Sequence, residues 1–202
     1  MTSIAAVVLL TRSLTAPAPQ LTAPKPAALP AYGIANNDTW TFKVYAKTDV
    51  QPYSTGGTLT IKFTERTPGK TWRMELTHAT EMTVGNDTAK GETMTAWYEA
   101  GTTLYPTGTG EGSLPFGPQL LACLILPATA EERIVLFGRD LWSSTVATKD
   151  DTTTVTTNIE EATGGKHKVT RVLDSKTRKL ISAKCETRNA LGLTVYELRP
   201  AK

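Results

Sequence analysis

The chain has 202 residues, 20% charged side chains and a net charge of +3, which is too small to indicate a nucleic-acid partner. Hydrophobic residues make up 40% of the sequence, enough for one substantial core in a single domain. Thr accounts for about one residue in six and favours half-exposed strand faces, so the composition predicts a sheet-rich protein.

Residues 1–35 predict a signal-like segment and a linker. The apolar run IAAVVLL at residues 4–10 has the length of a secretory h-region, too short to span a bilayer, and small residues follow it near Ala16 and Ala18. The stretch from Ala16 to Pro30 is rich in proline and alanine, which is typical of an extended tether. We therefore expect an extracytoplasmic protein, periplasmic or secreted, with residues 36–202 as one β-rich domain.

From Asp38 onwards, apolar and polar side chains alternate, which predicts strands with one buried face. Thr67-Pro-Gly-Lys70 predicts a hairpin turn, and residues 72–84 predict one long strand. The larger residues expected on the inner face are Trp40, Phe42, Leu59, Ile61, Phe63, Trp72, Met74, Leu76, His78, Met82 and Met94.

The middle of the chain, at about residues 116–138, predicts a two-helix insert. Residues 119–126 are almost entirely apolar and follow Pro118, which indicates a short buried helix. Thr129-Ala-Glu-Glu132 has the form of a capping box, which predicts a second helix through Phe137.

Alternation resumes after the insert and continues almost to the end of the chain. Residues 141–148, 152–160, 166–173, 179–187 and 193–198 predict five further strands separated by polar or glycine-containing turns. The fold class predicted is therefore mainly β: an antiparallel up-and-down meander of about nine strands, forming a curved sheet, half-barrel or barrel.

Few residues suggest chemistry. Gly69-Lys70-Thr71 ends like a phosphate-binding loop, but Thr64 stands where the loop requires glycine. Neither histidine has metal-ligand spacing: His78 shares the apolar face of its strand, and His167, between two lysines, is expected to be exposed. We predict no catalytic residue, metal or cofactor.

Two cysteines, Cys123 and Cys185, leave two alternatives open. They could form one disulfide in an oxidising compartment, or remain two buried thiols. A disulfide would require their Cβ atoms to face each other across the core.

The segments VLDSKTRKLI, starting at Val172, and NALGLTVY, starting at Asn189, resemble the closing hairpins of bacterial periplasmic LolA/LppX-like half-barrel lipoprotein carriers. The resemblance covers about forty residues. It implies a curved antiparallel sheet, closed by helices, that holds acyl chains. The chain departs from that group because it has no long helix before its first strand and its predicted helices lie mid-chain.

The leading hypothesis is a non-enzymatic extracytoplasmic binding protein for a hydrophobic ligand or lipid. The inner face would hold the ligand under helix 119–126, although the same side chains could equally form a dry core. An enzyme would require His78 to lie in a cleft beside a carboxylate or thiol.

The alternative is a structural or interaction protein that uses an exposed sheet face. Between Lys166 and Lys202, ten Lys or Arg residues outnumber three acidic ones. This segment predicts a basic face that is either simply solvated or bound to a weak anionic partner. The lysines of interest there are Lys166, Lys168, Lys179 and Lys184.

Overall fold

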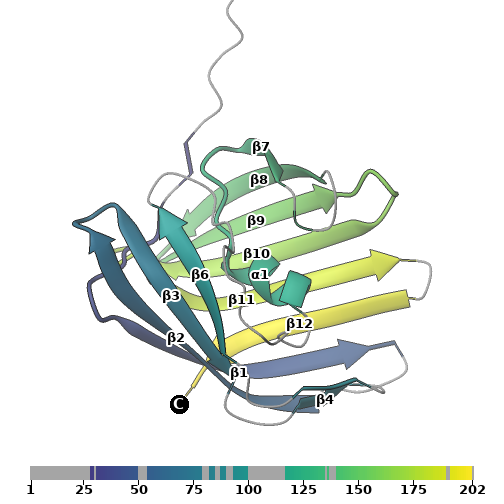
Figure 1. Ribbon diagram of the computed structural model, residues 1–202. Helices are drawn as coiled ribbons and strands as arrows, with labels where there is room; N and C mark the ends of the chain where they lie inside the picture. The colour runs from purple at the N-terminus through teal and green to yellow at the C-terminus, as the bar shows by residue number, and fades with distance from the viewer. Residues whose placement is uncertain are drawn as a thin grey trace, which may run out of the picture.

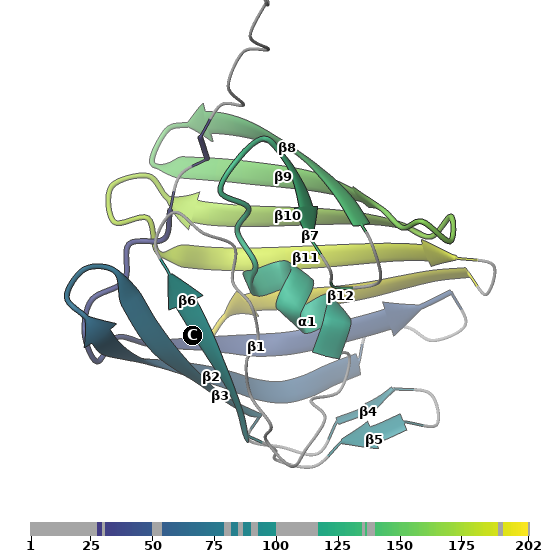
Figure 2. The same cartoon turned by 45° about the horizontal axis from the view of Figure 1, so that its top comes forward.

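The structure is a computed structural model that describes residues 28–29, 31–49, 54–78, 82–84, 87–89, 93–99, 117–134, 136, 140–189 and 192–201. In these ranges, ten strands form one antiparallel sheet and two more form a separate hairpin (Figures 1 and 2). The mainly β, antiparallel fold predicted from the sequence is confirmed.

The elements follow one another along the chain in this order: β1 (Thr39–Thr48), β2 (Ser54–Thr67), β3 (Thr71–His78), β4 (Met82–Val84), β5 (Asp87–Ala89), β6 (Thr93–Glu99), α1 (Gly117–Leu124), β7 (Glu131–Ile134), β8 (Asp140–Lys149), β9 (Thr152–Glu160), β10 (Lys166–Asp174), β11 (Leu180–Asn189) and β12 (Gly192–Pro200).

The large sheet consists of two meanders joined through the first and last strands. Its order is β6-β3-β2-β1-β12-β11-β10-β9-β8-β7, so β1 pairs with β12 in the middle, with Val44 opposite Leu198. The two edges, β6 and β7, both come from the middle of the chain and are not neighbours in the described sheet. The sheet is therefore open, and it curves around α1 (Figure 1).

Alternation along each strand determines which side chains enter the core. In β1, Trp40, Phe42 and Val44 are buried while Thr41 and Lys43 are exposed, as a period of two requires. The predicted hairpin turn closes with a hydrogen bond from the Lys70 amide to the Thr67 carbonyl (2.9 Å), with Gly69 at a φ of 64°.

The described residues form one helix, α1, which lies on the inner face of the sheet. It packs on β10, β11 and β12 and lies within the curve of the sheet (Figure 2). Every residue from Leu120 to Leu126 is buried, as its apolar sequence predicts. No described helix has the length and apolar character that crossing a membrane requires.

The second predicted helix is wrong, because its residues form β7. Glu131 lies opposite Ser143 in an antiparallel pair with β8. The Glu132 carboxylate accepts from the Ala128 amide (3.0 Å), and the Thr129 hydroxyl donates to the Glu131 carbonyl (2.7 Å). The expected capping groups thus stabilise the turn that leads into a strand. Phe137, the expected helix end, lies outside the described residues.

The long strand predicted at residues 72–84 is two separate strands. β3 ends at His78, and β4 pairs with β5 in the small hairpin, with Thr83 opposite Thr88. Met82 therefore belongs to a different sheet from Trp72. The alternating pattern continues across this break, so periodicity alone did not reveal it.

Candidate functional site

The described side chains predicted to line a ligand site are buried, and the apolar ones belong to one core that also includes α1 residues. The described members are all buried: Trp40, Phe42, Leu59, Ile61, Phe63, Trp72, Met74, Leu76 and His78. Met94 lies opposite Leu76 on β6, and Met82 lies on β4, but the side chains of both are outside the described part of the structure.

The inner face also contains a buried cation, Arg171, which belongs to the segment that the sequence predicts to be a basic face. Arg171 on β10 is 0% exposed. Its Nη1 donates to the Thr157 hydroxyl (2.9 Å), and its Nη2 donates to the Ala122 carbonyl on α1 (2.5 Å). The guanidinium carbon lies 6.0 Å from the centroid of the buried Trp142 ring. Arg171 therefore links the sheet to the helix that covers it.

Burial determines the electrostatics of Arg171. Desolvation lowers the pKa of its guanidinium, while the neighbouring Tyr32 and Cys123 act in the opposite direction. An arginine remains charged at neutral pH even so. Its Nε atom has no hydrogen-bond partner, and no carboxylate accepts from the guanidinium within the described residues.

The C-terminal end of α1 is held by two side chains from distant parts of the sequence. The last carbonyls of a helix lack partners within it and carry partial negative charge. Here the Ala122 carbonyl accepts from Arg171, and the Leu124 carbonyl accepts from the Tyr32 hydroxyl (2.9 Å). These bonds, with apolar packing, fix the helix on the sheet.

His167 is buried, at 4% exposure, so the prediction that it is exposed is wrong. Its flanking residues Lys166 and Lys168 are exposed because successive side chains on β10 point to opposite faces. His167 therefore shares the inner face with Arg171.

His167 lies in a hydrogen-bonded chain at the end of the β9–β10 hairpin. Its Nε2 donates to Glu161 Oε1 (2.5 Å), and its Nδ1 lies 3.0 Å from the Thr187 hydroxyl. The Thr163 hydroxyl donates to the other Glu161 oxygen (2.6 Å) and is the main cause that lowers the pKa of Glu161; burial opposes the effect and His167 adds to it. A Cβ on Gly165 would lie 2.5 Å from the Glu161 carboxyl carbon, so a larger residue there would displace the Glu161 carboxylate.

This chain of groups resembles a catalytic relay in composition, but the hydroxyl and the thiol on the Nδ1 side of His167 are buried. Thr187 is buried at 6% exposure. The Cys185 thiol, 3.9 Å from the Thr187 hydroxyl, is also buried, and burial raises its pKa to about 11. A thiol with such a pKa remains protonated and unreactive at neutral pH.

Both cysteines are buried free thiols, the second of the two alternatives that the sequence left open. Burial raises the pKa of Cys123 well above its ordinary value. Among the described residues, no group of three or more His, Cys, Asp or Glu side chains could hold a metal ion.

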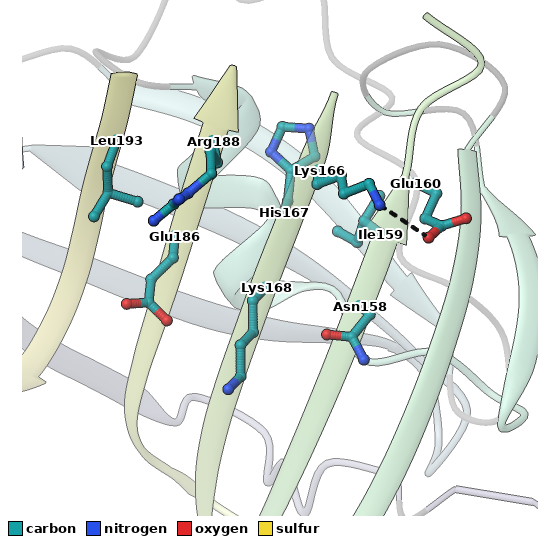
Figure 3. Close-up of a pocket in the computed structure, with 9 residues that line it drawn as sticks. All are labelled: Asn158, Ile159, Glu160, Lys166, His167, Lys168, Glu186, Arg188 and Leu193. Atoms are coloured by element: carbon teal, nitrogen blue, oxygen red, sulfur yellow. Dashed lines mark ion pairs between the residues drawn. The ribbon is translucent and has the colours of Figure 1, made fainter. Parts of the chain in front are cut away.

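A groove of about 360 Å³ lies along β9–β12, lined mostly by outer-face side chains together with two inner-face residues, Ile159 and His167 (Figure 3). Its charges are mixed, because Lys166 lies 3.9 Å from Glu160, and Lys184 beside the groove pairs with Glu186 at 2.8 Å. Lys179, also counted in the basic segment, pairs with Asp38 at 2.8 Å. The lining residues are Asn158, Ile159, Glu160, Lys166, His167, Lys168, Glu186, Arg188 and Leu193.

The sequence reasoning missed Arg171 and Glu161 as members of sites. The signal for Arg171 is its phase in β10, where it alternates with Val169 and Leu173 rather than with the lysines. Glu161 has a weaker signal, a carboxylate before a Gly-Gly turn that leads to His167.

No protein-family model, curated protein or solved structure matches the chain in sequence or structure comparisons.

Proposed function

We propose that this chain is a non-enzymatic binding protein that holds a hydrophobic small molecule or lipid on the inner face of its open sheet. The observation that supports this proposal is the relation of α1 to the sheet. One short apolar helix packs on β10–β12 within the curve of an inner face whose buried side chains extend from β1–β3 to β8–β12 (Figure 2). The resemblance to half-barrel carriers favours the same function.

The chemistry of α1 suits replacement by a ligand. Its buried side chains are apolar, and the side-chain bonds from the rest of the chain to its carbonyls come from Tyr32 and Arg171 in the described structure. An alkyl chain would recover about 0.8 kcal/mol for each CH₂ that it buries. A ligand of lipid length could therefore offset the displacement of leucine side chains such as Leu120 and Leu124.

The proposal includes a location outside the cytoplasm. This expectation depends on the apolar run and the proline-rich tether within residues 1–35, which lie mostly outside the described residues. Protein purified from its own source and examined by native mass spectrometry, before and after organic extraction, would reveal a co-purifying lipid.

Binding by purified full-length protein is the direct test. We expect the apolar probe N-phenyl-1-naphthylamine to bind saturably, with one probe per chain, and 1-hexadecanol to displace it. Thr41→Asp is the matched control, because Thr41 is exposed on β1 and alternates with the buried Trp40 and Phe42. Non-saturable binding to the unaltered protein would contradict an interior site. Loss of binding in the surface variant would contradict it as well.

The groove on the outer face favours a second candidate function, an interaction protein that binds a partner through this surface. If its lysines contact an anionic partner, Lys166→Glu and Lys168→Glu should abolish retention on heparin or anionic liposomes. Retention that persists in the double variant would count against the basic face.

A further inference from the structure

We infer that Arg171 is the binding site for the head group of an anionic amphiphile, a single alkyl chain that ends in a carboxylate or phosphate. This inference rests on the proposed function and specifies its ligand. The tail would lie on the apolar inner face, and the head group would meet the guanidinium between β10 and α1.

The fully buried charge of Arg171 has an incomplete set of hydrogen-bond partners. A guanidinium has five N–H donors, and two of them reach acceptors in the described structure, both neutral oxygens. Nε has none. Removing a charge from water without a counter-ion is costly, so an anion that binds here gains affinity by relieving that cost.

The geometry of the Arg171 guanidinium also suits an anionic head group. A carboxylate takes two parallel N–H bonds from one guanidinium, and Nε can supply one of them. The second would come from Nη2, which now donates to the Ala122 carbonyl. Exchange of that carbonyl for an anion would release the bond between Arg171 and α1, so binding of the head group and displacement of the helix become one event.

The surroundings of Arg171 combine hydroxyl groups with apolar side chains, as the head group and tail of an amphiphile require. The Thr157 hydroxyl already contacts Nη1 and lies 2.9 Å from the Ser144 hydroxyl, so a pair of neutral hydroxyls adjoins the cation. Trp142 and Cys123 supply apolar walls. By contrast, Glu161 and His167 are already hydrogen-bonded to each other, and the outer groove has mixed charges.

Isothermal titration of the full chain with palmitate, 1-hexadecanol and inorganic phosphate tests the inference. We expect palmitate to bind at least tenfold more tightly than 1-hexadecanol, since a hydrogen bond to a charged group contributes about a factor of ten to a hundred. Arg171→Met should remove this preference and leave 1-hexadecanol binding within about twofold. Arg171→Lys retains the charge but not the parallel N–H donors of the guanidinium. This variant should therefore retain part of the preference for palmitate.

Arg199→Met is the matched control, because Arg199 is partly exposed and pairs with Glu197 at 2.7 Å on the other face; we expect no change in either affinity. Equal binding of palmitate and 1-hexadecanol to the unaltered protein would overturn the head-group site while the proposed function stands. Binding of neither would overturn both. Phosphate alone binding as tightly as palmitate would show an anion site without a tail, and would also overturn the inference.

The comparison of ligands on unaltered protein decides the outcome even if Arg171→Met does not fold. Circular dichroism of each variant identifies that case. A charge preference that survives in a folded Arg171→Met variant would assign the head group to another residue and refute the role of Arg171.

Discussion

Replacing Glu161 by Gln tests whether the buried His167 chain depends on a carboxylate charge. The change keeps the size of the side chain and removes the charge that accepts from His167 Nε2 (2.5 Å) and from the Thr163 hydroxyl (2.6 Å). The Glu161 side chain is 19% exposed, so solvent screens it only partly. Hydrogen bonds to charged groups contribute about 1.5–3 kcal/mol each, and Gln retains one acceptor. We expect a loss of roughly 2–3 kcal/mol at pH 7.

The pH dependence has a defined sign. The pKa of Glu161 is lowered from its ordinary value of 4.5, so the unfolded chain takes up the proton first as the pH falls. The contribution of this carboxylate to stability is therefore complete above about pH 4.5 and is lost as the pH drops through the lower folded-state pKa. The difference between wild type and Glu161→Gln should be largest at pH 7 and should shrink below about pH 4.5.

Urea unfolding followed by tryptophan fluorescence at pH 7, 5.5, 4.5 and 3.5 measures this difference. Titrating groups that do not contact Glu161 are common to both proteins and cancel. Gly165→Ala is a second approach, because its Cβ would displace the Glu161 carboxylate from 2.5 Å away. The free energy of unfolding lost in the double variant, Glu161→Gln with Gly165→Ala, should be smaller than the sum of the losses in the two single variants. A stability difference that is equal at pH 7 and pH 3.5 would refute the reasoning.

Three further predictions concern α1 and the thiols. Leu124→Ala should cost about 2–5 kcal/mol in urea unfolding, because Leu124 is 1% exposed; a loss below 1 kcal/mol would contradict tight packing. Tyr32→Phe should cost about 1–3 kcal/mol in the same assay by leaving a buried carbonyl without its donor, and an unchanged midpoint would contradict this. Cys123 and Cys185 should resist iodoacetamide at pH 8 until urea unfolds the chain, as mass spectrometry would show; rapid labelling of folded protein would argue against their burial.

The parts of the fold that the sequence predicted are those governed by local periodicity. Alternation in β1 correctly predicts the inner position of Trp40 and Phe42, and the apolar run predicts the burial of α1. β7 was missed because Thr129 and Glu132 match a four-residue helix signal, whereas pairing with β8 determines the conformation. Tertiary contacts therefore override a local propensity at this point.

The candidate site depends on contacts that local patterns do not contain. Arg171 and Ala122 are 49 positions apart in the sequence, and Tyr32 and Leu124 are 92 apart. His167 was misassigned because its lysine neighbours suggested a solvated segment, although strand geometry directs them to the opposite face. The positions of Arg171 and His167 on β10 were both mispredicted for the same reason: the charge of the segment does not indicate on which face of the strand each side chain lies.

The pairing of β1 with β12 affects how the chain matures. Phe42 lies opposite Pro200, so β1 finds this neighbour only after the intervening residues 43–199 have been synthesised. At 5–20 residues per second this delay is roughly 10–30 s. During that interval one side of β1 lacks its β12 partner, so the nascent chain depends on remaining monomeric until β12 has been synthesised. A circular permutant that joins residue 202 to residue 1 and begins at β7 would make β12 and β1 consecutive, and should fold faster because its contact order is lower.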